Sequence, residues 1–444
     1  MPRASSVVGQ TPVKIQSLTA LQVLDSRGNP TLEVEATLSD GTRANAQVPS
    51  GASTGKHEAV ELRDGPDGRY AGKSVLQAVA NVDKAIAPEV HGLPADDQAG
   101  LDHRLIALDG TPDKSRLGAN AILGVSTAVA RGAAQSRGLE LWRHLAGYRP
   151  AAIPVPMINI LSGGLHAGGQ IEFQDFLAVP HGFFSFAEAL EAAVAIHREA
   201  ARLIKSQGHQ LTGVADEGGL GPRLDSNEKA LDLMVDAISA AGFEPGEQVS
   251  IAIDVAASHF EREGTYHLAS ENRELTSAGM TDLLSDWVDR YPILSIEDGL
   301  AEDDWAGWTS LTATIGRRSS LIGDDLLVTN PARLERAIAE KAANAVLVKM
   351  NQIGTLTETF EVIDRAREAG FRAVISARSG ETEDSFLADL AVASGAGQIK
   401  VGSITRSERL AKYNRLLRIE RDSKRAGEGP LGFDHSRALL TSGR

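Results

Sequence analysis

Five short apolar segments in the second half of the chain each run into a charged residue, and this arrangement limits the folds that the chain can adopt. The stretches between them are long enough to form a helix each. Buried strands that alternate with helices are typical of a (β/α) barrel, in which loops at the carboxyl ends of the strands share one face. We therefore expect side chains that are distant in sequence to meet in one site. The charged residues are Asp254, Glu297, Asp324, Lys349 and Lys400.

These five residues suit the chemistry of an enzyme. The carboxylates of Asp254, Glu297 and Asp324 can hold a hard divalent cation such as Mg²⁺, which prefers oxygen ligands. An aspartate alone is more often a turn or capping residue, so it is the set of three that favours a metal site. Two lysines can bind an anion or act as a base. Burial and a nearby cation would lower the pKa of Lys349 towards the range of a general base, although a role as counter-ion is also open.

Composition excludes several classes of function. The chain has 444 residues, a net charge of −14 and no cysteine. The acidic excess argues against nucleic acid or an anionic membrane as the main partner, and the lack of cysteine excludes disulfides and thiolate metal sites. Neither a signal peptide nor an apolar stretch of the ~20 residues that a membrane span needs is evident. The sequence therefore predicts a soluble, cytoplasmic protein.

The first part of the chain has a different pattern from the second. Residues 12–50 alternate apolar and polar positions between turn sequences, which predicts a three-stranded antiparallel meander. Helical periodicity follows in Val75–Ile86 and Ala119–Ala134. The proline-punctuated stretch 150–156 is the predicted domain boundary. We expect an α+β capping domain at 1–150, a (β/α)₈ barrel at 151–422 and a loosely attached C-terminal tail at 423–444.

Glycine- and serine-rich segments supply further polar side chains. Asp216–Gly219 places two acids on a turn where a backbone can approach a ligand. Ser376–Glu381 offers a guanidinium and a hydroxyl group, which suit a phosphate or carboxylate. Ser50–Gly55 is a small-residue loop that could close over a site, and His166 lies in the mobile-looking loop Ser162–Gly168. Four other histidines are expected to be surface or core residues: His57, His103, His197 and His259.

Motifs along most of the chain resemble those of the enolase family. The resemblance runs from Leu24–Pro30 to Arg406–Lys412, about nine-tenths of the sequence. Val255–Ser258, Gly323–Leu326 and Asn351–Gly354 are specific markers and follow the family's order. The resemblance implies an enolase-type modified (β/α)₈ barrel with an N-terminal α+β domain, assembled as a homodimer or a larger homo-oligomer.

The resemblance also implies a role for the strand-end residues. Asp254, Glu297 and Asp324 would hold a high-affinity Mg²⁺, and Ser53 would bind a second one. Lys349 would take the C2 proton of 2-phosphoglycerate. Such a proton is very weakly acidic beside a carboxylate, and cations that touch the developing negative charge make its removal feasible.

Further residues would bind the substrate. By the resemblance, Lys400 would hold the substrate carboxylate, and Arg378 and Ser379 its phosphate. Glu217 would be the acid that assists departure of the C3 hydroxyl group. Two more residues would line the pocket: Gln174 and His166.

Two positions depart from the family pattern. Asp175 stands where the family has Glu, and Ala377 stands where it has His, both on the hydroxyl-leaving side around Glu217. Loss of positioned acid–base groups typically costs about 10²–10⁴-fold in rate. We therefore expect a diverged paralogue of the carboxyphosphonoenolpyruvate synthase type, which acts on phosphorylated or phosphonylated three-carbon acids in phosphonate biosynthesis. The space at Ala377 could admit a second, larger substrate.

Two alternatives stay open. One is an ordinary phosphopyruvate hydratase that tolerates both changes and converts 2-phosphoglycerate to phosphoenolpyruvate. The other is a non-catalytic homologue that acts as a binding protein, against which the intact metal and base positions argue. An assay of hydratase activity separates the three interpretations.

Overall fold

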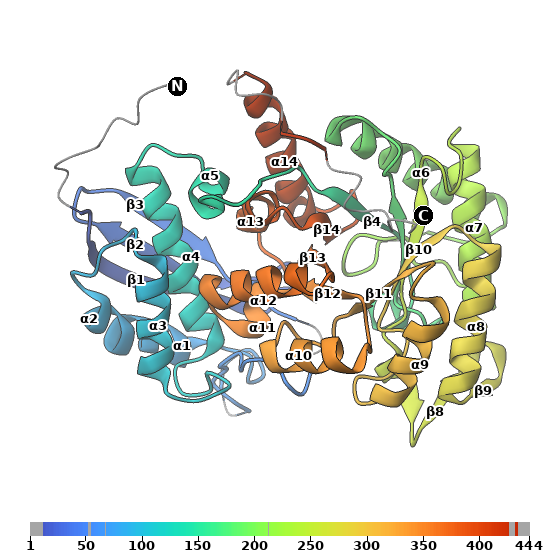
Figure 1. Cartoon of the computed structure of the whole chain (residues 1–444), viewed down its shortest axis with the longest axis horizontal. Coiled ribbons are helices and arrows are strands. Elements are labelled where there is room, and N and C mark those ends of the chain that lie inside the picture. The colour runs from blue at the N-terminus through green and yellow to red at the C-terminus, as the bar shows by residue number, and fades with distance from the viewer. Residues whose placement is uncertain (1–11, 52–54, 67, 212, 426–430, 434–444) are drawn as a thin grey trace.

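The computed structural model describes residues 12–51, 55–66, 68–211, 213–425 and 431–433. Two parts lie side by side in Figure 1, an N-terminal part in blue and cyan and a larger part in green to red. The first contains a small sheet with helices, and the second contains a closed barrel. The predicted fold class, a modified barrel preceded by an α+β domain, is confirmed.

The small sheet is the antiparallel meander that the sequence predicts. Its order is β1-β2-β3, and each strand runs antiparallel to the next. Gly28 and Gly41 lie in the two connections with φ of 73° and 88°, a region that residues with a side chain rarely adopt. The strands are β1 (Ile15–Leu24), β2 (Pro30–Leu38) and β3 (Arg43–Gln47).

Helices cover one face of this sheet. The central one, α4 (Ala119–Ser136), approaches it closely, because a Cβ atom at Gly124 would lie only 2.6 Å from the side chain of Val34. Both predicted helical segments are confirmed, although the first continues into a π-helical turn. The other helical segments of this part are α1 (Leu76–Ala80), η1 (Asn81–Ile86), α2 (Ala87–Val90), α3 (Gln98–Asp109) and α5 (Leu141–Ala146).

The second part is an eight-stranded barrel closed in the order β10-β11-β12-β13-β14-β4-β5-β6. Its strands are β4 (Val155–Ser162), β5 (Asp175–Val179), β6 (Ser250–Asp254), β10 (Ile293–Glu297), β11 (Ser320–Gly323), β12 (Ala345–Val348), β13 (Arg372–Ser376) and β14 (Gly397–Gly402). Strand β5 runs antiparallel to both neighbours, and the other adjacent pairs are parallel. This reversed strand distinguishes the barrel from a regular (β/α)₈ barrel.

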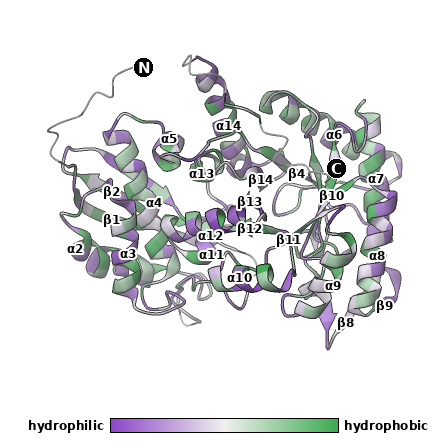
Figure 2. Cartoon of the chain, in the orientation of Figure 1, coloured by the Kyte–Doolittle hydropathy of each residue, from purple (hydrophilic) through white to green (hydrophobic). Residues whose placement is uncertain are grey.

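Amphipathic helices surround the barrel. On α8, Met280, Leu284 and Trp287 are buried at spacings of four and three residues, and the outer side of this helix is hydrophilic in Figure 2. The helices are α6 (Phe186–Ser206), α7 (Asn227–Ala240), α8 (Ser277–Arg290), α9 (Trp305–Ile315), α10 (Pro331–Glu340), α11 (Met350–Ile353), α12 (Leu356–Glu368), α13 (Phe386–Ser394) and α14 (Ser407–Arg425). Short elements complete this part: η2 (Gly164–Ala167), η3 (Ala257–His259), β7 (Glu261–Arg262), β8 (Thr265–Leu268), η4 (Ala269–Glu271) and β9 (Arg273–Leu275).

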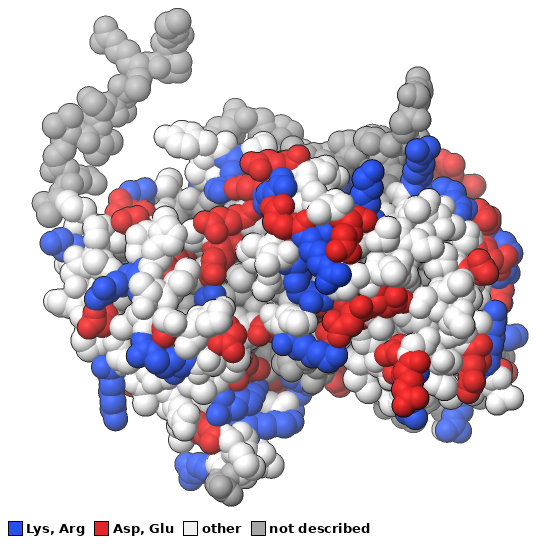
Figure 3. Space-filling model, turned by 60° about the horizontal axis from the view of Figure 1, so that its bottom comes forward, with Lys and Arg blue, Asp and Glu red and all other residues white. Residues whose placement is uncertain are grey.

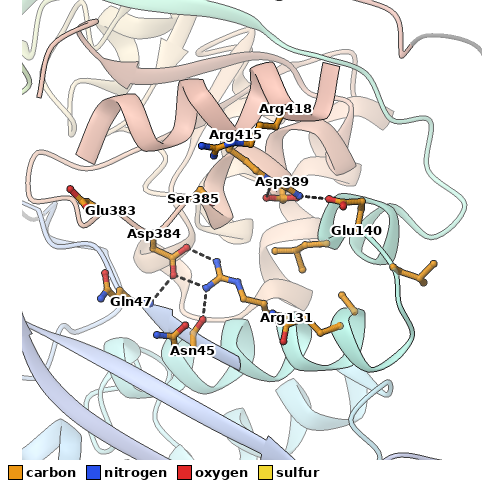
Figure 4. A pocket seen from close by; sticks show the side chains of 14 residues that line it. Asn45, Gln47, Arg131, Glu140, Glu383, Asp384, Ser385, Asp389, Arg415 and Arg418 are labelled. Carbon is orange, nitrogen blue, oxygen red and sulfur yellow. Dashed lines mark hydrogen bonds and ion pairs between the residues drawn. The ribbon is translucent and has the colours of Figure 1, made fainter. Parts of the chain in front are cut away.

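Ion pairs connect the two parts beside a cavity of about 610 Å³. Figure 4 shows Arg131 of α4 pointing to Asp384, which precedes α13. Their closest atoms, Arg131 Nη2 and Asp384 Oδ1, are 2.5 Å apart, and the side chains are 18% and 8% exposed. Burial would raise the pKa of Asp384, but Arg131 outweighs it and holds this pKa below its usual range.

Substitution of Asp384 by asparagine should therefore destabilise the protein. Removal of one partner leaves the other charge buried, which typically costs about 3–5 kcal/mol. Because the folded-state pKa of Asp384 is depressed, this contribution is present above the unfolded-state pKa of about 3.9 and is lost as the pH falls through the folded-state value. Urea unfolding should show a larger difference between wild type and variant at pH 7 than at pH 3, where part of the contribution is already lost.

The double variant Arg131→Met/Asp384→Leu is the control for this pair. It removes both charges, so it should cost less than Asp384→Asn alone. A loss below about 1 kcal/mol in Asp384→Asn, the value of an exposed pair, would contradict the assigned burial.

The C-terminal segment is more structured than predicted. Helix α14 continues to Arg425, past the expected start of the tail at Ser423. The backbone N–H of Ile153 donates to the carbonyl of Gly432 at 3.0 Å, and Phe433 is buried. Described residues of the expected tail thus lie against the start of the barrel.

The surface carries charges of both signs. On the face shown in Figure 3, acidic and basic side chains are interspersed. In the described part of the chain, no helix combines the length and the apolar character that spanning a bilayer requires.

Candidate active site

The predicted strand ends converge on one cavity. Asp254 and Glu297 are the last residues of β6 and β10, and Asp324 and Lys349 directly follow β11 and β12. Lys400 differs from the prediction, because β14 continues beyond it. All five side chains line the same cavity.

Lys400 bridges two of the predicted metal ligands. Its Nζ donates to Asp254 Oδ2 and to Glu297 Oε2, each at 2.7 Å, and the three side chains are at most 7% exposed. A buried ammonium group between these carboxylates shows that the position attracts positive charge. The oxygen-only donor set fits a hard cation such as Mg²⁺.

The third predicted ligand belongs to a wider acidic cluster. Gln352 Nε2 donates to Asp324 Oδ1 at 3.0 Å. The carboxyl group of Asp298 accepts from the backbone N–H groups of Asp324 and Asp325 at 3.0 and 2.8 Å. Carboxylate oxygens of these three aspartates lie within 4.8 Å of one another. Sequence reasoning missed Asp298 and Asp325, although each directly follows a predicted ligand.

Lys349 is paired with Asp324, and this pairing governs its pKa in this structure. Its Nζ donates to Asp324 Oδ2. Burial lowers the pKa of Lys349, as expected, but the negative charge of Asp324 outweighs burial and raises the pKa above its ordinary value. The sequence left open both a base and a counter-ion role, and the predicted lowering of the pKa also requires a nearby cation. In this structure, Lys349 is a counter-ion.

The shorter acid Asp175 keeps a full set of partners. Its Oδ2 lies 2.9 Å from His166 Nδ1, and its Oδ1 accepts from Ser162 Oγ at 2.8 Å and from Asn159 Nδ2. Asp175 is fully buried and Glu217 is 7% exposed. Single ligand atoms of His166, Asp175 and Glu217 lie within 4.8 Å of one another. His166, Asp175 and Glu217 therefore form a connected acid–base cluster.

The pKa values place a proton of this cluster on the histidine. Burial lowers the pKa of His166, but the charges of Asp175 and Glu217 outweigh burial and raise it to about 9. Burial raises the pKa of Glu217, but His166 and nearby cations outweigh burial and lower it. An ionised Glu217 beside a protonated His166 follows at neutral pH.

Ala377 opens little space. Its backbone N–H donates to the carbonyl of Lys400 at 2.9 Å, and the residue is 6% exposed. The cavity that it lines has a volume of about 40 Å³. A water molecule needs about 10–15 Å³ of such space, so the cavity has room for a few waters. A volume this small would not hold 2-phosphoglycerate either, so it does not test the expected space for a second substrate.

The predicted phosphate end lies after β13. Arg378 and Ser379 line the cavity, and the guanidinium of Arg378 contacts Glu58 and Asn351. Gln174 also lines it and donates to Asp254 Oδ2 at 3.2 Å. The predicted ligand Ser53 lies outside the described residues.

Two cavity residues carried no usable signal in the sequence. His259, expected at the surface or in the core, lines the cavity, and burial lowers its pKa. Glu58 reaches the site from the N-terminal part. Neither lies at a barrel strand end, so the strand pattern could not indicate them.

A barrel with carboxylates and lysines at its strand ends, beside a histidine–carboxylate cluster, defines an enzyme with an acid–base centre. The family model for the enolase C-terminal TIM barrel domain matches residues 150–428, and the model for the enolase N-terminal domain matches residues 15–145. A protein of Methylococcus capsulatus named Enolase 1 is 55% identical over 414 residues, which cover 93% of this chain and 98% of that protein. The chain belongs to the enolase family, whose members are Mg²⁺-dependent carbon–oxygen lyases.

These findings correct the favoured functional prediction. The expectation of a carboxyphosphonoenolpyruvate synthase type of paralogue is wrong, because a relative this similar over nearly the whole chain is an enolase. The physical reason lies at the two divergent positions. Asp175 still contacts His166, and Ala377 keeps its backbone hydrogen bond to the carbonyl of Lys400.

Proposed function

We propose that this protein is a phosphopyruvate hydratase, which removes water from 2-phosphoglycerate to give phosphoenolpyruvate. The observation that supports this most strongly is the 2.9 Å contact between Asp175 and His166 beside Glu217. This contact holds a histidine that can carry a proton on the side of the site where the leaving hydroxide must be protonated. The 55% identity to a protein named Enolase 1 also supports the proposal.

The substrate would lie between two sets of cations. Lys400, now paired with Asp254 and Glu297, would hold the substrate carboxylate. Arg378 and Ser379 would hold the phosphate, since a guanidinium fork matches phosphate oxygens. Because the carboxylate and the phosphate of the substrate would be held by different groups, its C2 hydrogen and C3 hydroxyl group would be fixed relative to the protein.

The reaction would proceed as two proton transfers. Lys349 takes the proton from C2 in its neutral form, which it would reach once Asp324, its counter-ion in this structure, pairs with another cation. The electron pair of the C2–H bond moves towards the carboxylate of the substrate. The C3–O bond then breaks, and the leaving hydroxide accepts a proton and departs as water. Before the reaction this proton is held on His166, and Glu217 passes it to the hydroxide. Asp175 keeps His166 in place, and Gln174 donates to Asp254 Oδ2 in the same pocket.

Asp254, Glu297 and Asp324 would hold one Mg²⁺, and Ser53 would contribute to a second site. Bound there, Mg²⁺ supplies positive charge that lowers the cost of negative charge developing on the substrate. We further propose a homodimer or larger homo-oligomer. The domain limit at 150/151 is also retained as a proposal, whereas the expected tail limit at 423 falls inside α14.

Incubation of the wild-type protein with 2-phosphoglycerate and Mg²⁺ in deuterated water tests the proposal. Phosphorus NMR should show conversion to phosphoenolpyruvate without any added acceptor, and recovered substrate should carry deuterium at C2. Exchange without dehydration would contradict the role of the hydroxyl-leaving cluster. If neither exchange nor dehydration occurs, the proposed function as a whole is contradicted.

A further inference from the structure

Glu58 of the N-terminal part forms a forked ion pair with Arg378 of the barrel. Glu58 Oε2 accepts from Nη1 at 2.9 Å, and Glu58 Oε1 accepts from Nη2 at 3.3 Å. The two side chains are 7% and 4% exposed. A buried guanidinium without a nearby anion would be costly, and this carboxylate compensates it.

A third contact fixes the plane of the guanidinium. Asn351 Oδ1 accepts from Arg378 Nη1 at 3.1 Å, and Asn351 Nδ2 donates to the carbonyl of Pro49 at 3.3 Å. The five N–H donors of arginine form a rigid planar fork. Three contacts on one side of the fork therefore determine where its other donors point.

Glu58 is itself held from two directions. Its Oε1 accepts from the backbone N–H of Gly55 at 3.0 Å and from Gln352 Nε2 at 3.3 Å. The next residue, Ala59, donates its N–H to the carbonyl of Gln352 at 2.8 Å. The carboxylate is thus anchored both to its own loop and to the barrel, as a support for another side chain requires.

We propose that Glu58 is a positioning residue, which orients Arg378 for the substrate phosphate without touching the substrate. This rests on the proposed function, in which Arg378 binds that phosphate. The N-terminal part is then a component of the phosphate site, since it supplies the carboxylate that holds the arginine in place.

The same ion pair could have the opposite effect on phosphate binding, and this can be tested. A carboxylate on Arg378 can compete with phosphate, and its neutralisation would then strengthen phosphate binding. A positioning carboxylate has the reverse effect, because its loss lets the fork rotate away. The sign of the change in affinity separates the two.

The test compares Glu58→Gln with wild type. Four quantities are measured with Mg²⁺ present: the Kd of inorganic phosphate by calorimetry, the KM and the kcat for 2-phosphoglycerate, and the inhibition constant of D-glycerate, which lacks the phosphate. Loss of a charge-assisted pair should raise the Kd and KM by about 10–100-fold. Inhibition by glycerate and kcat should change little, because only binding of the phosphate end is affected. Glu58→Asp keeps the charge, so its Kd for phosphate and its KM should lie between those of wild type and Glu58→Gln.

Glu61→Gln is the matched control in the same loop. Glu61 accepts from Ser50 Oγ at 3.1 Å and from Arg63 Nη2 at 2.7 Å, so it holds other partners than Arg378. It should leave phosphate binding near the wild-type value. Equal weakening in both variants, weaker glycerate binding in Glu58→Gln, or unchanged or tighter phosphate binding there would each overturn the proposal.

Calorimetry measures phosphate binding without turnover, so failure of the positioning role can be told apart from failure of the proposed function. The wild-type protein could bind phosphate more tightly than Glu58→Gln and yet not dehydrate 2-phosphoglycerate. That result would refute the function and support the positioning role. A wild-type protein that binds no phosphate would overturn the positioning role directly. Thermal unfolding of each variant shows whether it is folded, and Glu58→Asp supplies the measurement if Glu58→Gln is not.

Discussion

Replacement of Lys349 by alanine should lower the turnover of 2-phosphoglycerate by about 10²–10⁴-fold, the usual effect of losing a positioned base. Lys349 follows β12, lines the cavity and has no other lysine beside it on that strand. Exchange of the C2 proton with solvent deuterium should stop as well. This exchange reports the first proton transfer by itself, so it tests the base separately from the release of hydroxide.

Lys349→Arg distinguishes a base from a counter-ion. Arginine keeps the positive charge beside Asp324 and stays protonated at any usable pH, so it cannot accept the C2 proton. It should therefore be as inactive as the alanine variant, while a counter-ion role alone would be rescued. Undiminished exchange in Lys349→Ala would move the base elsewhere, with Lys400 as the next candidate.

Replacement of Asp324 by alanine should abolish activity and weaken Mg²⁺ binding in calorimetry. The carboxylate has three functions in the account: it is a proposed metal ligand, it pairs with Lys349 and it accepts from Gln352. Dialysis of the wild type against a chelator should remove activity in the same way, and added Mg²⁺ should restore it. Restoration should fail in Asp324→Ala at the same metal concentration.

Asp289→Ala serves as the control for that variant. Asp289 pairs with Arg318 at the surface, outside the cavity, so its loss should leave metal binding and turnover unchanged. Wild-type activity that persists after removal of Mg²⁺, or an Asp324→Ala variant with unchanged metal affinity, would contradict the assigned ligand set.

The barrel could be predicted from the sequence because its strands and the residues at their ends form a repeated local pattern. Asp254 and Glu297 are strand-terminal residues in the structure, as predicted. The sequence could not decide between a base and a counter-ion role for Lys349, because its pKa depends on the position of Asp324, which follows another strand. Glu58 was missed for the same reason, since it approaches Arg378 from a different part of the fold.

The functional prediction failed at two residues whose types were read without their contacts. A shorter acid at Asp175 suggested a withdrawn carboxylate, yet the side chain still contacts His166, Ser162 and Asn159. A small residue at Ala377 suggested a vacancy for a second substrate, yet a relative that is 55% identical over nearly the whole chain is named an enolase. A change of residue type indicates what is lost from a position, and only the surrounding geometry shows whether neighbours compensate.

Turnover of the unmodified protein on 2-phosphoglycerate and Mg²⁺ alone is the most direct test of the account. Formation of phosphoenolpyruvate can be followed by its ultraviolet absorbance. If the protein is a phosphopyruvate hydratase, its kcat should lie within the ordinary enzymatic range of about 1–10³ s⁻¹, despite Asp175 and Ala377. A rate about 100-fold or more below that range, or dehydration only when a second acceptor substrate is added, would contradict it.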